Sequence, residues 1–128
     1  MALMTGEQYI ESIKKIKMEI YMFGEKYSNP TESPILRPSL NSVRMTYDLA
    51  RMPEYEDLMT VVSPYTGTRV NRFTHIHQCP EDLLKKQEMT RKICGMCGGC
   101  VQRCMGIDMM NALSSVVKDV DTKYGTPY

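Results

Sequence analysis

Four of the chain's five cysteines lie within eleven residues, at Cys94, Cys97, Cys100 and Cys104. Their spacing is C-x2-C-x2-C-x3-C, with three glycines between the sulfurs. Thiolates ligate zinc and iron–sulfur clusters. Residues 1–7 lack the basic and apolar runs of a secretory signal, and the number of cysteines is odd. The run therefore predicts metal or redox chemistry in a reducing cytoplasm and argues against a disulfide framework.

Spacing alone leaves several ligands open for the four cysteines. Two zinc knuckles need a spacer of about a dozen residues, but two residues separate Cys97 from Cys100. The run has the spacing of bacterial ferredoxins, but Met105 follows it where those proteins have Pro, and no second motif is present. Burial of all four as free thiols is the remaining interpretation, which their crowding disfavours.

Cys100 and Cys104 are four residues apart at the start of a helix that we expect to begin near Cys100. This spacing places both sulfurs on one helix face, with Cβ atoms about 5–6 Å apart. Such a pair could hold one edge of a cluster, and two further ligands would come from elsewhere. Cys94 and Cys97, in a glycine-rich loop, could supply these ligands or be bystanders.

A few residues outside the cysteine run are further candidates for a functional site. His75 and His77 share one face of an extended stretch, which a metal could use, although packing is the commoner role. Cys79 is interpreted as a lone structural thiol. Tyr47 and Tyr55 could line a pocket, but packing in the core or against a subunit is the simpler role.

The composition predicts one globular domain. The chain has 128 residues, of which 42% are hydrophobic and 24% charged. The net charge of +1 offers no electrostatic case for nucleic acid or an anionic membrane as partner. No apolar run approaches the length of a membrane span. Twelve methionines suit a soft core or a subunit-facing surface.

The first half of the chain is predicted to hold two helices, with a strand and a loop between them. A capping box at Thr5 begins a helix over 5–15, and alternation predicts a strand over 17–23. The proline-rich residues 28–38 form a loop. A second helix is capped by Ser39 and stopped by Pro53.

The second half is expected to hold a hairpin and two helices. The hairpin joins strands over 59–63 and 68–73. A third helix begins at Pro80 and is interrupted by the glycines from Gly95 on, and a fourth runs from near Cys100 to Tyr124. The fold class is therefore mainly α with a few short strands, in a single domain over residues 1–128.

Residues 91–108, which hold the cysteine run, resemble the cluster-binding segment of the 4-hydroxybutyryl-CoA dehydratase family. Further segments that resemble this family are 9–12, 21–25, 35–39, 45–50, 52–59 and 71–75. The resemblance covers essentially all 128 residues. The wider family of 4-hydroxyphenylacetate 3-monooxygenases shares the architecture but lacks the paired cysteines.

The resemblance implies the N-terminal helical domain of an acyl-CoA dehydrogenase-like fold. Family chains are several times longer, add a central β domain and a C-terminal helical domain, and form homotetramers. They carry FAD and one [4Fe-4S] cluster. They dehydrate 4-hydroxybutyryl-CoA to crotonyl-CoA by a radical mechanism and isomerise vinylacetyl-CoA.

Residue by residue, Cys100 and Cys104 match two cluster thiolates of the family, and Gln102 matches a polar residue near the substrate. A surface amide on a helix is the alternative for Gln102. The other ligands, a His and a third Cys, and most of the flavin site lie beyond this chain, so the chain alone is expected to be inactive. Cys94 and Cys97 depart from the family pattern.

Two alternatives remain. One is a stand-alone iron–sulfur or zinc module that uses all four clustered cysteines. The other is a flavin-dependent 4-hydroxyphenylacetate hydroxylase-type domain.

Overall fold

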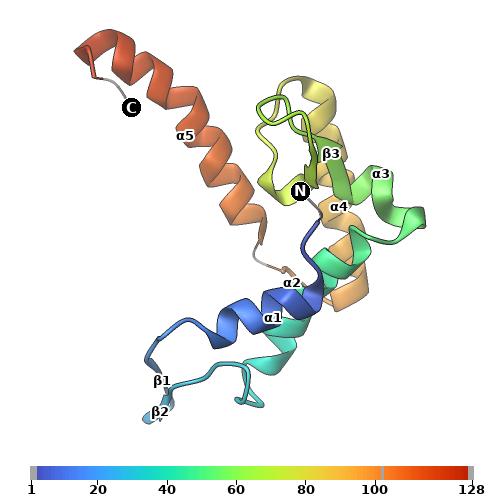
Figure 1. Ribbon diagram of the computed structural model, residues 1–128, viewed down its shortest axis with the longest axis vertical. Helices are drawn as coiled ribbons and strands as arrows, with labels where there is room; N and C mark the ends of the chain where they lie inside the picture. The colour runs from blue at the N-terminus through green and yellow to red at the C-terminus, as the bar shows by residue number, and fades with distance from the viewer. Residues whose placement is uncertain (1–2, 102, 127–128) are drawn as a thin grey trace.

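The computed structural model describes residues 3–101 and 103–126, and it confirms a mainly helical fold with a few short strands (Figure 1). The elements of the first half are α1 (Gly6–Lys14), β1 (Ile20–Met22), β2 (Glu25–Tyr27), α2 (Arg37–Leu49) and the 3-10 turn η1 (Pro53–Tyr55). Those of the second half are α3 (Glu56–Met59), β3 (Thr60–Val62), β4 (Arg69–Asn71), the 3-10 turn η2 (Arg72–Thr74), α4 (Pro80–Cys97) and α5 (Arg103–Tyr124).

Helix α1 begins at the predicted capping box. The Thr5 hydroxyl accepts from the Gln8 backbone, and the Gln8 side chain accepts from the Thr5 N–H. The Gly6 N–H then donates to Asp48 Oδ1 of α2 at 2.9 Å. A Cβ at Gly6 would lie 2.5 Å from the Arg44 side chain, so glycine permits the close approach of α1 to α2.

Two antiparallel hairpins complete the secondary structure. In the first, Ile20 pairs with Tyr27 and Met22 with Glu25. In the second, Thr60 pairs with Asn71, and this hairpin lies within the two β-prone runs predicted to form one. Figure 1 shows the β1–β2 hairpin beyond the end of α1, far from the β3–β4 hairpin.

The core lies where α2, α3, η2, α4 and the first turns of α5 meet. Its fully or nearly fully buried apolar side chains are Leu49, Ala50, Met59, Phe73, Met89, Ile93, Val101 and Ile107. Arg72 is buried among them and donates to the carbonyls of Asp57, Leu58 and Thr60. This arginine ties η2 to the chain that leads from α3 into β3.

Several predicted boundaries were wrong. Helix α2 begins at Arg37, ahead of Ser39, because Pro38 fits the donor-free first turn of a helix. The strand predicted over 17–23 is confined to Ile20–Met22. Pro53 begins η1, after α2 has already ended at Leu49.

Gly95 does not interrupt α4, which continues to Cys97 and ends at Gly98 in the left-handed conformation, with φ of 70°. At its other end α4 begins at Pro80, as predicted. Helix α5 begins at Arg103, three residues later than expected, and ends at Tyr124, before Gly125.

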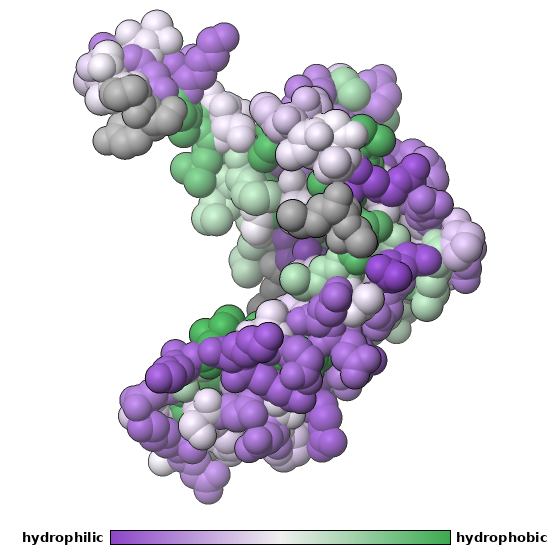
Figure 2. Space-filling view, in the orientation of Figure 1, coloured by the Kyte–Doolittle hydropathy of each residue, from purple (hydrophilic) through white to green (hydrophobic). Residues whose placement is uncertain are grey.

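Helix α5 extends away from the rest of the chain (Figure 1). Its first half packs on η2 through the fully buried Ile107. Met105, Met109, Leu113 and Val116 recur at helical spacing on another face and are each more than half exposed. Figure 2 shows apolar side chains along this part of α5. Among the described residues, no helix is both long enough and apolar enough to cross a membrane.

Candidate functional site

The thiols of Cys100 and Cys104 meet at the entry to α5. Their sulfur atoms lie 3.5 Å apart, within hydrogen-bonding distance. Cys100 is exposed and precedes the helix, whereas Cys104 is its second residue and is half-buried. Burial, together with the hydrogen bond to Cys100, raises the pKa of the Cys104 thiol. The two thiols are thus close together, as the spacing predicted, although Cys104 belongs to α5 and Cys100 lies before its first residue.

The prediction that Cys94 and Cys97 lie in a glycine-rich loop was wrong, because both belong to the last turn of α4, which ends at Gly98. The Cys97 thiol donates to the Gly99 carbonyl at 2.8 Å. Nowhere in residues 3–101 and 103–126 do three or more His, Cys, Asp or Glu side chains gather as a metal-ligand set. The four cysteines, predicted as one run, therefore do not form a preassembled four-thiolate site.

Arg103 is the residue of this site that sequence reasoning missed. Its guanidinium carbon lies 4.4 Å from the ring centroid of Tyr47 and 4.6 Å from that of Phe73. Its Nη1 donates to the Thr46 hydroxyl, which in turn donates to the Val43 carbonyl. Burial lowers the pKa of Arg103. Among the described residues it forms no ion pair.

One sequence signal could have drawn attention to Arg103. The positive end of the helix macrodipole disfavours a cation in the first turn, yet Arg103 is the first residue of α5. A basic residue at this position therefore needs a stabilising contact, which the rings of Tyr47 and Phe73 supply.

Two cavities meet at Arg103. A cavity of about 340 Å³ is lined by Cys100, Val101 and Arg103 together with the first turns of α2. A wider one, of about 1080 Å³, runs along α1 and β4 and is lined by Tyr47 and Arg103. Tyr47 therefore belongs to a cavity wall, where its ring stacks on Tyr9 with centroids 5.0 Å apart. Tyr55 packs against the core.

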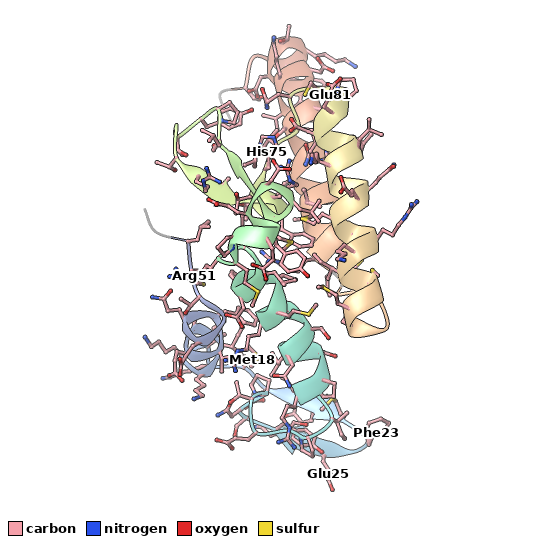
Figure 3. All side chains as sticks on the ribbon, turned by 90° about the vertical axis from the view of Figure 1, so that its right-hand side faces the viewer. Met18, Phe23, Glu25, Arg51, His75 and Glu81 are labelled. Carbon is pink, nitrogen blue, oxygen red and sulfur yellow. The ribbon has the colours of Figure 1, made fainter. Side chains whose placement is uncertain are left out.

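The two histidines lie near each other, but each has a local role. Their ring centroids are 6.2 Å apart. His75, labelled in Figure 3, is 3% exposed. Its Nε2 lies 3.0 Å from Asp82 Oδ2. The His77 N–H donates to Asn111 Oδ1, and Asn111 Nδ2 donates to the His75 carbonyl. These bonds fasten the segment to α5.

Two further predictions concern single residues. Cys79 is exposed at the N-terminal end of α4. Gln102, the residue predicted near the substrate, lies outside the described residues.

The sequence matches the family model described as 4-hydroxyphenylacetate 3-hydroxylase N terminal over residues 5–128. The chain belongs to the 4-hydroxyphenylacetate 3-hydroxylase family. Within this family it is 49% identical, over 98% of its length, to the 4-hydroxybutyryl-CoA dehydratase/vinylacetyl-CoA-Δ-isomerase of Clostridium aminobutyricum. The predicted family resemblance is thereby confirmed.

A solved structure of a 4-hydroxybutyryl-CoA dehydratase, from N. maritimus and described as oxygen tolerant, superposes on 98% of this family member. The TM-score is 0.91 and the sequence identity 42%. The oxygenase component of 4-hydroxyphenylacetate 3-monooxygenase from Geobacillus is 31% identical over 84% of the chain. A structure of such a component with FAD gives a TM-score of 0.59 over 70% of the chain, at 28% identity. The chain spans about a quarter or less of the length of these relatives.

Proposed function

We propose that the chain is the N-terminal helical domain of an enzyme that dehydrates 4-hydroxybutyryl-CoA to crotonyl-CoA, with FAD and a [4Fe-4S] cluster, and that isomerises vinylacetyl-CoA. Cys100 and Cys104 are two of the cluster's ligands. The observation that carries the proposal is a thiol pair 3.5 Å apart in a chain that is 49% identical, over 98% of its length, to a dehydratase of this kind.

The donor set fits half of a cluster site. Cys100 is exposed and Cys104 is half-buried. Thiolates are the usual ligands of iron–sulfur clusters. No third ligand from the described residues joins them, so two ligands would have to come from polypeptide beyond these 128 residues. Arg103 lines the same cavity as Cys100 and forms no ion pair with a described carboxylate, so its positive charge suits an anionic centre in that cavity.

The protein's own residues would hold and shape this site. Bound at the thiol pair, a cluster would supply a Lewis acid for the departing hydroxyl group, while FAD would supply one-electron redox chemistry. Cys100 lines the smaller cavity and would present the cluster to it. Gln102 is proposed to lie close to the acyl-CoA substrate.

A segment exchange tests this function. Residues 1–128 would replace the corresponding segment of the Clostridium aminobutyricum enzyme, and the chimera would be purified without oxygen. We expect a chimera that binds FAD, contains about four irons per chain and converts 4-hydroxybutyryl-CoA to crotonyl-CoA. A chimera that folds and holds FAD but neither binds iron nor dehydrates the thioester contradicts the proposal.

Two pairs of serine variants in the chimera distinguish the proposed cluster ligands from the other two cysteines. Cys100→Ser and Cys104→Ser should each reduce the iron content and abolish dehydration. Cys94→Ser and Cys97→Ser are the matched controls and should retain both properties. If the control pair loses the cluster and the first pair keeps it, the ligand assignment is wrong.

The second candidate is a flavin-dependent 4-hydroxyphenylacetate hydroxylase-type enzyme. It is supported by the 31% identity over 84% of the chain to such an oxygenase component. Hydroxylation of 4-hydroxyphenylacetate by the iron-free chimera, supplied with reduced flavin and O₂, would favour it. No observation favours the stand-alone four-cysteine module, which a four-iron cluster on the isolated chain would reveal.

The remaining expectations belong to the same proposal. They are an acyl-CoA dehydrogenase-like whole protein in which residues 1–128 form one domain, a homotetramer, and a cytoplasmic location. Gel filtration with light scattering of the chimera checks the tetramer.

A further inference from the structure

We infer that Arg103 is the positioning residue of the thiol pair. Its guanidinium, clamped between the rings of Tyr47 and Phe73, sets the place where α5 begins and thereby holds Cys104 beside Cys100. The inference rests on the proposed function insofar as the pair is taken to bind a cluster.

The clamp joins three elements at one point. Tyr47 belongs to α2, Phe73 to η2, and Arg103 is the first residue of α5. The bond from Arg103 to the Thr46 hydroxyl fixes the orientation of the guanidinium plane. A planar cation between two aromatic faces is stabilised by cation–π attraction, which is strongest where water is excluded.

The position of this clamp matters because two glycines lie in the loop that precedes it. The left-handed Gly98 and the neighbouring Gly99 permit many paths from α4 to α5. Cys100 is exposed, whereas Val101 is buried in the core and Cys104 directly follows Arg103. Val101, which directly follows Cys100, and Arg103, which directly precedes Cys104, are therefore the two residues that anchor the thiols to the fold.

Thiol exchange measures the proximity of the pair directly. The 128-residue chain would be prepared with Cys79, Cys94 and Cys97 replaced by Ser and equilibrated with glutathione. Formation of one Cys100–Cys104 bond reduces one glutathione disulfide to two glutathione thiols and releases no other product. The equilibrium constant therefore reports how closely the fold holds the two sulfurs.

In this background we expect Arg103→Met to lower the equilibrium constant by about tenfold, because it removes a cation–π contact of ordinary strength. Arg103→Lys keeps the charge but loses the planar stacking, so its equilibrium constant should lie between those of Arg103→Met and the parent chain. Arg91→Met on the exposed surface of α4 is the matched control and should leave the constant unchanged. Circular dichroism and thermal unfolding establish that each variant is folded.

Thr46→Val and Tyr47→Leu keep the test decisive if Arg103→Met does not fold. Each removes one contact of the guanidinium and should lower the constant by a smaller factor. If every folded variant exchanges like the parent chain while losing stability, Arg103 has a purely structural role and the inference is overturned.

A Cd²⁺ titration separates this inference from the proposed function. Thiolate-to-Cd²⁺ charge-transfer absorption should appear in the parent chain and disappear in Cys100→Ser/Cys104→Ser, and Arg103→Met should weaken it. If Cd²⁺ does not bind to the two thiols, the ligand assignment of the proposed function is wrong, while the exchange constant still decides the role of Arg103.

Discussion

The sulfur atoms of Cys100 and Cys104 lie 3.5 Å apart even though Cys100 lies three residues before the first residue of α5. Their contact is made by the path of the chain between α4 and α5. This path begins at Gly98, whose φ of 70° turns the chain at the end of α4. We therefore expect the distance between the two thiols to depend on the backbone freedom of Gly98.

Replacing Gly98 by Ala should separate the thiols. A side chain in the left-handed region costs about 1 kcal/mol or more, so the loop should relax to another path and the exchange constant with glutathione should fall. Gly99→Ala is the control, because Gly99 has no left-handed φ and a Cβ there meets no atom within 4 Å. Equal exchange constants for the two variants would show that the turn at Gly98 does not determine how close the two thiols lie.

Local patterns predicted the features of this chain that depend on neighbours in sequence. The Thr5 capping box, the helix start at Pro80 and the second hairpin were all predicted correctly, because each depends on a few adjacent residues. The cysteine spacing likewise indicated that Cys100 and Cys104 belong together.

Features that depend on distant contacts were not predicted. The start of α5 at Arg103 follows from rings on α2 and η2, and its hydrogen bond to Thr46 spans 57 residues. No local pattern encodes such a contact. Gly95 was taken as a helix breaker, but α4 tolerates it because one helical glycine costs only about 1 kcal/mol.

Two glycine-to-alanine changes should have opposite effects on stability. Gly6→Ala would place its Cβ 2.5 Å from Arg44 Cγ and 2.6 Å from the Asp48 carboxylate, forcing α1 away from α2. We expect a loss of about 1–3 kcal/mol, as for other overpacked sites. Gly106→Ala lies in α5 with no atom within 4 Å of its Cβ, and should gain about 0.5–1 kcal/mol. Urea unfolding measures both, and a stabilised Gly6→Ala would refute the close packing of the two helices.

Arg72→Met should strongly destabilise the chain. The substitution fills similar space but leaves the carbonyls of Asp57, Leu58 and Thr60 without their donor. We expect a loss of about 2 kcal/mol or more in the free energy of unfolding. Arg51→Met is the control, since the exposed Arg51 side chain, labelled in Figure 3, donates to the Leu3 carbonyl. Equal losses from both variants would mean that the buried carbonyls find other donors.

The two faces of α5 should respond differently to substitution. Val116 is 54% exposed, so Val116→Lys should change stability by no more than about 0.5 kcal/mol. It should also weaken binding of the dye ANS, which reports exposed apolar surface. Ile107 is fully buried, and Ile107→Ala should cost about 2–5 kcal/mol. Strong destabilisation by Val116→Lys would show that this face is covered in solution.

His77 should make the chain less stable in mild acid. Burial, and then the positive charge of Lys86, lowers the pKa of His77 below its ordinary value of 6.5, although Asp82 and Asp108 oppose this shift. Its Nε2 is buried without a hydrogen-bond partner among the described residues.

The sign of the effect follows from proton binding. In the unfolded chain His77 takes up a proton near pH 6.5, whereas in the folded chain it stays neutral to lower pH. The unfolded state therefore binds more protons as the pH falls, and stability that is present above about pH 6.5 declines below it. Urea unfolding at about pH 7.5 and about pH 5.5 should show this loss, since the carboxylates titrate mainly below that range. His77→Gln should reduce it, and an unchanged pH dependence in His77→Gln would assign the effect to another group.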